Sequence, residues 1–184
     1  MRRTFLGRPS ISLTGFMFTG KSSVGRTLAR RLGLVFVDLD TEIVRREGDS
    51  INNIFERRGE EVFRRLEREA VARVIPARGQ VVATGGGVVL ERENREIMAA
   101  HSCVVWLRAS KETILERSRE SRGRVRPLLS VEDPEKVITD LLRHREPFYG
   151  ECSFAVDTDN LSVNEVCDSI IKSICALDQD REGA

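Results

Sequence analysis

The fold of this chain can be read outward from Gly15-Phe16-Met17-Phe18-Thr19-Gly20-Lys21-Ser22, which matches the phosphate-binding pattern G-x-x-x-x-G-K-[ST]. A short apolar run, Ile11-Ser12-Leu13, precedes this loop, and residues 24–32 follow it with helical spacing. A strand, a glycine-rich loop and a helix N-terminus together form an anion site, because backbone N–H groups and the helix dipole face the ligand. We therefore predict that Lys21 adds a full positive charge and that Ser22 offers its hydroxyl to a Mg²⁺ ion. A chance match in a helix-capping loop is the alternative, and the flanking strand and helix argue against it.

Length and composition are typical of a single domain of ordinary polarity. The chain has 184 residues, of which 40% are hydrophobic and 32% are charged, and its net charge is +1. We therefore expect one domain, with a core at about 10–176, and no general affinity for nucleic acid. No apolar run approaches membrane-spanning length, and no secretory signal is recognised at the start. The four cysteines lack C-x-x-C spacing, so we expect reduced thiols and a cytoplasmic location.

Strand and helix signals alternate along the chain. Apolar runs of strand type follow the first strand at residues 35–38, 81–84, 103–107 and 154–157. Helical patterns lie between and after them at residues 41–46, 51–58, 61–77, 93–100, 111–121, 134–149 and from 163 onward, before a charged tail (177–184) that we expect to fray. This alternation predicts the α/β class, with a parallel sheet covered by helices on both faces. In such sheets ligands bind at the carboxyl ends of the strands.

Carboxylates and glycines follow two of the expected strands. Asp38 and Asp40 come where the second strand ends, and alternate residues of an extended chain share a face, so we predict that both point into the cleft beside the P-loop. One would help to hold Mg²⁺ through its water shell, and the other would accept a hydrogen bond from a substrate hydroxyl. A solvated strand end, with Asp40 capping the next helix, is the alternative. Gly85-Gly86-Gly87 follows the third strand and allows positive φ and close approach to a ligand, although a simple turn would look the same.

A basic segment and two single arginines complete the candidates. Residues 122–126 hold three arginines and a glycine before Pro127, a composition typical of a lid that closes over phosphates and excludes water. Arg126 would then stabilise charge on the transferring phosphoryl group, although a solvated basic loop is an equal alternative. Arg64 and Arg145 lie in helical patterns, and composition alone does not distinguish them from surface residues.

Taken together, these motifs resemble the shikimate kinase family from about Ile11 to Ile174. The ordered series comprises the P-loop, Asp38-x-Asp40, Gly59-Glu60-Glu61-Val62-Phe63-Arg64, Thr84-Gly85-Gly86-Gly87, Arg126-Pro127-Leu128-Leu129 and Arg145-x-Pro147-x-Tyr149. Only the P-loop is specific by itself, and the order and spacing of the set carry the resemblance. It implies a three-layer α/β sandwich of the P-loop kinase type, with a five-stranded parallel sheet in the order 2-3-1-4-5.

The resemblance also implies a reaction, in which ATP phosphorylates the 3-hydroxyl of shikimate on the route to chorismate and the aromatic amino acids. By motif position, shikimate would be bound by Asp40, Arg64, Gly85, Gly86, Gly87 and Arg145, whose two guanidinium groups suit a carboxylate. ATP would be bound by Gly15, Gly20, Lys21, Ser22, Ser23, Arg119 and Arg126, with Arg119 against adenine, and Mg²⁺ by Ser22 and Asp38. Lys21, Asp40 and Arg126 would be the catalytic residues. We expect a helical substrate region at about 41–77, a lid at about 119–131, and a monomer that binds neither nucleic acid nor membrane.

One P-loop residue departs from the family pattern, in which glycine usually stands at the position of Phe18. Phenylalanine does not readily adopt positive φ, and a loop that demands it would carry about 1–3 kcal/mol of strain. We still expect nucleotide binding, because the general P-loop pattern allows any residue there.

Two other classes of function stay open at this point. The first is a different small-molecule kinase, for gluconate or a nucleoside monophosphate, and convergence of Arg64 and Arg145 on one pocket with Asp40 would argue against it. The second is a nucleotide-binding regulator without turnover, which Phe18 keeps open. A GTPase is disfavoured, because the chain has no Asn-Lys pair for a guanine-binding motif.

Overall fold

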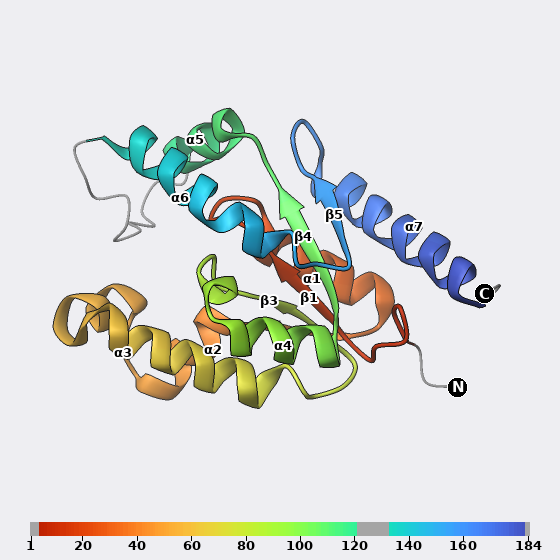
Figure 1. Ribbon diagram of the computed structural model, residues 1–184, viewed down its shortest axis with the longest axis horizontal. Helices are drawn as coiled ribbons and strands as arrows, with labels where there is room; N and C mark the ends of the chain where they lie inside the picture. Colours follow the sequence, from red (N-terminus) through yellow and green to blue (C-terminus); the bar gives the residue numbers. More distant parts are fainter. Residues whose placement is uncertain (1–3, 121–132, 183–184) are drawn as a thin grey trace.

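The computed structural model describes residues 4–120 and 133–182 and is built around one parallel sheet (Figure 1). Its strands are β1 (Ile11–Thr14), β2 (Val35–Asp38), β3 (Gln80–Ala83), β4 (Cys103–Arg108) and β5 (Phe154–Asp157). They pair in parallel in the order β2-β3-β1-β4-β5, which confirms the predicted topology. The strand that leads into the P-loop therefore lies at the centre of the sheet.

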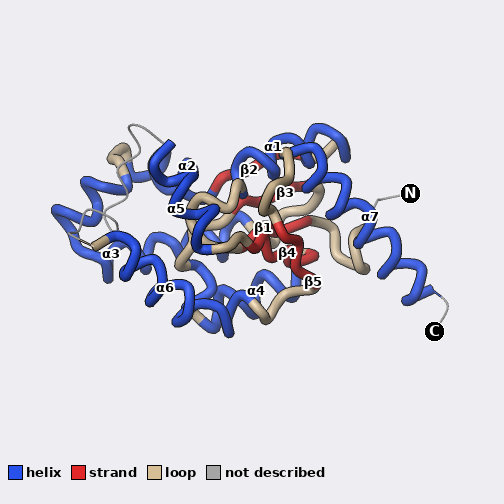
Figure 2. The backbone as a smooth tube through the Cα atoms, turned by 90° about the horizontal axis from the view of Figure 1, so that it is seen from above, coloured by secondary structure: helices blue, strands red, loops and turns tan. Residues whose placement is uncertain are grey.

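Helices cover both faces of this sheet. They are α1 (Lys21–Leu32), α2 (Leu39–Glu47), α3 (Ile51–Val74), α4 (Arg92–His101), α5 (Lys111–Glu120), α6 (Pro134–Tyr149) and α7 (Val163–Glu182), with a short 3₁₀ turn, η1 (Val88–Leu90). Figure 2 shows α1 and α4 on opposite sides of the strands. Helices α1 and α7 pack together, as do α3 and α4. None of the helices described is both long and apolar enough to cross a membrane.

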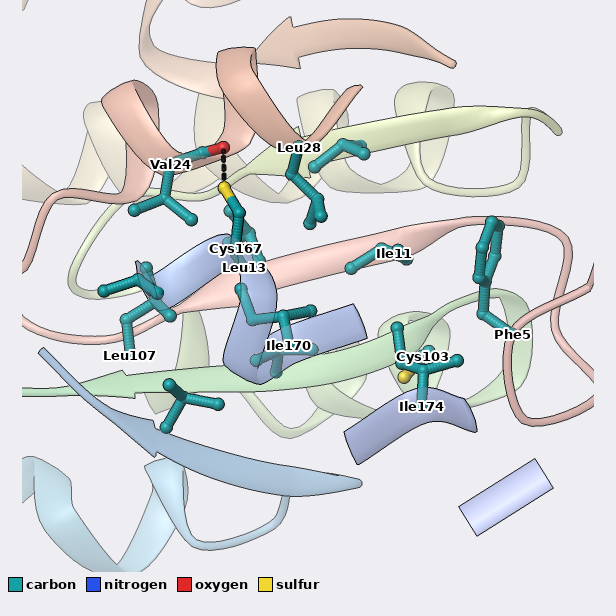
Figure 3. Close-up of a cluster of buried hydrophobic side chains, with 14 of the residues drawn as sticks. Phe5, Ile11, Leu13, Val24, Leu28, Cys103, Leu107, Cys167, Ile170 and Ile174 are labelled. Carbon is teal, nitrogen blue, oxygen red and sulfur yellow. Dashed lines mark hydrogen bonds between the residues drawn. The ribbon is translucent and has the colours of Figure 1, made fainter. Parts of the chain in front are cut away.

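Apolar side chains fill the space on each face of the sheet. On one face, Ile11 and Leu13 of β1 pack with Leu28 of α1 and Ile170 of α7 (Figure 3). Each of these side chains is fully buried. Burying an apolar side chain of this size stabilises the folded state by roughly 1.5–3 kcal/mol. A second cluster on the other face includes Val82 of β3. Burial on both faces of the central strands β1, β3 and β4 explains why they read as apolar runs and not as alternating patterns.

Two local features refine the predicted elements. Gly59, at φ 82° and ψ 167°, breaks the helical path inside α3, at the boundary expected between 51–58 and 61–77. The charged tail differs from expectation, because α7 continues from Val163 to Glu182 instead of ending near Leu177. No glycine or proline interrupts it before residue 183, and its charged residues are compatible with an exposed helix.

Candidate active site

A cavity of about 970 Å³ lies at the carboxyl ends of β1, β2 and β3. Its walls contain most of the predicted site residues: Gly20, Lys21, Ser22, Ser23, Asp38, Asp40, Arg64, Gly85, Gly86, Gly87 and Arg145. These residues come from separate parts of the sequence, and only the fold brings them together. Arg64 and Arg145 share one pocket with Asp40, which argues against a kinase for gluconate or a nucleoside monophosphate.

In this structure the lysine of the P-loop donates hydrogen bonds to carbonyl oxygens of the same loop. Lys21 Nζ donates hydrogen bonds to the carbonyl oxygens of Gly15 (2.8 Å) and Phe16 (2.6 Å). Gly20 takes φ 87° directly before α1, a conformation that glycine adopts without steric cost. Gly15 does not line the cavity; at φ 135° it passes so close to the Leu107 carbonyl that a Cβ would collide with that oxygen. Gly15 therefore shapes the loop, while Lys21 stands at the cavity wall.

Phe18 adopts the left-handed conformation that the sequence made doubtful, with φ 65°. A non-glycine residue there costs on the order of 1 kcal/mol. Its half-buried side chain packs against a small apolar cluster that contains Phe16, Ile114 of α5 and Ile138 of α6. Burial of the ring offsets part of this strain. The loop thus accommodates phenylalanine without losing the glycine-type backbone at this position.

Asp38 and Asp40 both line the cavity, but not by the geometry that the sequence suggested. Asp38 ends β2, whereas Asp40 already belongs to the first turn of α2. Asp38, and not Asp40, caps this helix: its Oδ1 accepts from the N–H groups of Asp40 (3.1 Å) and Thr41 (3.3 Å). Its other oxygen, Oδ2, accepts a 2.6 Å hydrogen bond from Ser22 Oγ. Asp38 therefore connects the P-loop helix to the start of α2.

Arg64 is held by two carboxylates of its own helix, α3. Its Nη1 donates to Glu67 Oε2 (2.8 Å), and its Nη2 donates to Glu60 Oε1 (3.0 Å). Glu67 is only 1% exposed, and burial raises the pKa of its carboxyl, opposed by the charge of Arg64. Its second oxygen, Oε1, has no hydrogen-bond partner among the described residues. Sequence reasoning missed Glu67, although its i,i+3 spacing from Arg64 is the usual spacing of a helical ion pair.

The three glycines after β3 make room for these charged groups. A Cβ at Gly85 would lie 2.5 Å from Glu67 Oε1 and 3.3 Å from Asp40 Oδ1. A Cβ at Gly87 would overlap the guanidinium group of Arg64. None of the three has positive φ, so the structure does not use that freedom of glycine here, and the predicted close approach to a ligand stays a prediction.

Arg145 reaches the cavity from α6 and is 3% exposed. Its Nη1 donates to the Gly86 carbonyl (3.2 Å), which also accepts a 2.5 Å hydrogen bond from the Tyr149 hydroxyl. Burial raises the pKa of Tyr149 to about 12, so this hydroxyl remains a donor at neutral pH. Arg145 Nε has no hydrogen-bond partner within the described part of the chain. A buried guanidinium with an unused donor is suited to an anionic ligand.

Besides Gly15, the structure leaves two further predicted nucleotide residues, Arg119 and Arg126, unplaced at the cavity. Arg119 is on α5 and is absent from the cavity wall, whereas Arg117, two residues earlier, lines it. Arg126 and residues 121–131 of the predicted lid lie outside the described residues. The roles of Arg119 and Arg126 therefore stay predictions, and Arg117 is a cavity residue that sequence reasoning did not identify.

Burial of Glu67 predicts a pH dependence of stability. Because its folded pKa lies above the ordinary value of 4.5, its contribution is full below that value and is lost as the pH rises through the folded pKa. The free energy of unfolding of the native chain should therefore fall, relative to Glu67→Gln, as the pH rises above 4.5, the ordinary pKa of a glutamate. Denaturant titrations at several pH values measure this difference.

Glu69→Gln is the matched control, because Glu69 lies on the same helix but is 46% exposed. Its difference from the native chain should stay nearly constant over the same pH range. If the free energy of unfolding of the native chain, relative to Glu67→Gln, stays constant or rises with pH, the raised pKa of Glu67 is contradicted.

Comparisons with known proteins agree with this geometry. A family model described as "Shikimate kinase" matches residues 17–175. The shikimate kinase of Thermodesulfovibrio yellowstonii is 44% identical over 163 residues, which cover 89% of this chain and 93% of that protein. A shikimate kinase of Thermus thermophilus is 44% identical over 176 residues, or 95% of each chain. A solved shikimate kinase from Acinetobacter baumannii, in complex with shikimate, superposes with a TM-score of 0.88 at 37% identity and covers 92% of this chain and 94% of that one. The chain therefore belongs to the shikimate kinase family.

Proposed function

We propose that this chain transfers the γ-phosphoryl group of ATP to the 3-hydroxyl of shikimate and releases ADP and shikimate 3-phosphate. The observation that carries the proposal is the shared cavity, in which Lys21 of the P-loop lines the same walls as Arg64 and Arg145. A substrate carboxylate held by the two arginines would lie within the same cavity as the phosphates held by the P-loop. The relative with bound shikimate supports this choice of acceptor.

Positioning and charge account for the chemistry that these residues would perform. Phosphoryl transfer passes through a loose transition state, so the protein mainly aligns the two reactants and stabilises charge. Arg64 and Arg145 would fix the carboxylate of shikimate, and Asp40 would accept a hydrogen bond from the reacting hydroxyl and orient it. Lys21 would leave the carbonyl oxygens of Gly15 and Phe16 to bind the transferring phosphate.

The donor set beside the P-loop fits a magnesium ion. Ser22 Oγ and Asp38 Oδ2 lie 2.6 Å apart at the cavity wall, and a hydroxyl with a carboxylate offers the hard oxygen ligands that Mg²⁺ prefers. We propose that Ser22 binds the ion directly and Asp38 through water. When bound, Mg²⁺ neutralises charge on the phosphates.

The reaction is tested by measuring ADP release with MgATP and shikimate, against gluconate, AMP and no acceptor. We expect ADP release only when shikimate is the acceptor. Release with gluconate or AMP would move the acceptor to another class. ATP binding without ADP release for any acceptor would favour the nucleotide-binding regulator.

The monomeric state and the cytoplasmic location remain predictions. Sedimentation of the purified chain tests the first of them.

A further inference from the structure

Side chains of α4 hold all three carbonyl oxygens of η1, the short turn that directly follows the three glycines of the cavity wall. Asn94 Nδ2 donates to the Val88 carbonyl (3.0 Å). Arg95 Nη1 donates to the carbonyl oxygens of Val89 (2.7 Å) and Leu90 (3.2 Å). Carbonyl groups in the last turn of a helix have no partner within that helix, so these donors from α4 fix the turn in place.

The turn is bonded in its own right to the glycine segment. The Val88 N–H donates to the Gly85 carbonyl (3.3 Å), and the Leu90 N–H donates to the Gly87 carbonyl (3.0 Å). The N–H groups of η1 therefore hold the glycines, while its carbonyl groups are held by α4. A displacement of η1 would move the backbone of the glycine segment with it.

The glycine segment lies between the two arginines that are proposed to bind the substrate carboxylate. A Cβ at Gly87 would overlap the guanidinium group of Arg64, and the Gly86 carbonyl accepts from Arg145 Nη1 (3.2 Å). The helices that carry these arginines, α3 and α6, both pack against η1. The position of η1 and the glycines therefore sets the separation of the two guanidinium groups.

Arg95 also links η1 to the end of the helix that carries Arg145. Its Nε donates to Glu151 Oε2 (2.7 Å), just after α6, and its Cζ lies 4.9 Å from the centre of the Phe148 ring. Phe148 is three residues from Arg145, on the same side of the helix. The Arg95 side chain is only 13% exposed, and within the described residues it does not belong to the cavity wall. Its effect on a ligand in the cavity is therefore indirect.

We infer that Arg95 is a positioning residue for the substrate carboxylate, which acts by joining η1 to the end of α6 and so fixing the separation of Arg64 and Arg145. The inference rests on the proposed function for its choice of ligand, shikimate. Because Arg95 acts on the arginine pair and not on the P-loop, its effect should appear in shikimate binding and not in nucleotide binding.

The first test measures the Kd of shikimate by calorimetry, and the KM values of shikimate and ATP, for Arg95→Met. We expect the Kd and the KM of shikimate to rise about 10-fold, because a small displacement of a positioned group weakens its contacts steeply. The kcat and the KM of ATP should stay unchanged, since the carboxylate is held equally before and during phosphoryl transfer.

Arg92→Met is the matched control, because Arg92 lies on the same helix, is 84% exposed and pairs with Glu96. Its Kd of shikimate should equal that of the native chain. A merely structural role for Arg95 would lower the denaturation midpoint and leave the Kd of shikimate unchanged. That result, or equal rises in the KM values of shikimate and ATP, would overturn the inference.

A second variant, Glu151→Ala, keeps the inference testable if Arg95→Met does not fold. Glu151 is 55% exposed, and its loss frees Arg95 from the end of α6 while both carbonyl contacts remain. We expect the Kd of shikimate to rise about 2- to 3-fold, the effect of one exposed ion pair. Glu93→Ala, at an exposed site of α4, is the control and should leave the Kd unchanged. An unchanged Kd for Glu151→Ala would contradict the link between η1 and α6.

A third test asks whether Arg95 acts through the pair of arginines. In the background Arg64→Met with Glu67→Gln only one arginine of the pair remains, so there is no separation left to fix. Arg95→Met should then lower kcat/KM for shikimate by less than about 3-fold, against about 10-fold in the native chain. An equal loss in both backgrounds would overturn the inference. Failure of the proposed function is distinct, because the native chain itself would then release no ADP with shikimate.

Discussion

Lys21→Met is expected to lower the kcat for shikimate-dependent ADP release by about 10³-fold or more while the chain stays folded. Removing a single preorganised stabiliser of developing charge typically costs about 10²–10³-fold, and Lys21 brings a full charge to the phosphates. The substitution also removes two hydrogen bonds to the carbonyl oxygens of Gly15 and Phe16. The denaturation midpoint should therefore be measured together with kcat, so that destabilisation of the P-loop can be distinguished from a slower phosphoryl transfer.

Lys111→Met is the matched control for this experiment. It makes the same change of side chain, but Lys111 lies at the start of α5, where it pairs with Glu135 at the surface. The kcat of this variant should match that of the native chain. Turnover retained by Lys21→Met would contradict the phosphate-binding role of the loop.

Arg64→Met is expected to raise the KM of shikimate by about 10- to 100-fold and to leave the KM of ATP nearly unchanged. The range corresponds to hydrogen bonds between charged groups of about 1.5–3 kcal/mol. The reason is geometric as well as electrostatic, because Glu60 and Glu67 hold the guanidinium in place before the substrate arrives. Initial rates at varied shikimate and fixed saturating ATP, and the reverse, give the two constants.

The same substitution removes the charged partner of Glu67, which is almost completely buried. Loss of one member of a buried pair is destabilising, so the double variant Arg64→Met with Glu67→Gln provides a folded alternative. Arg68→Met, one turn further along α3 and 37% exposed, is the control for the helix. A parallel loss of ATP affinity in Arg64→Met would count against its assignment to the shikimate side.

Local signals explain how much of the fold the sequence predicts. The P-loop and the break at Gly59 depend on neighbours in the chain, and each is found where expected. Strand order depends on contacts between distant segments, and its prediction came from the family resemblance. Asp40 shows the limit of a local rule: the chain has already turned into α2 at this residue, so the extended-strand argument no longer applies.

The site residues that sequence reasoning missed all depend on tertiary neighbours. Glu67 is one of several acids on α3, and only the packing of that helix against Gly85 makes it a buried group. Arg117 resembles any basic residue near a helix end until Thr158 and Phe18 are placed beside it. Tyr149 belongs to the family motif, but its role in holding the Gly86 carbonyl needs the fold. Periodicity cannot supply such contacts.

The distribution of the cavity residues has a thermodynamic consequence. Segments as far apart as Arg64 and Arg145 meet there, so a ligand that contacts both cannot bind a chain in which either segment has come loose. Binding is then linked to global unfolding, and free ligand at about 100 times its Kd adds about 2.7 kcal/mol to the stability of the native state. Shikimate and nucleotide should accordingly protect the whole chain, and not only the residues that they contact, from proteolysis.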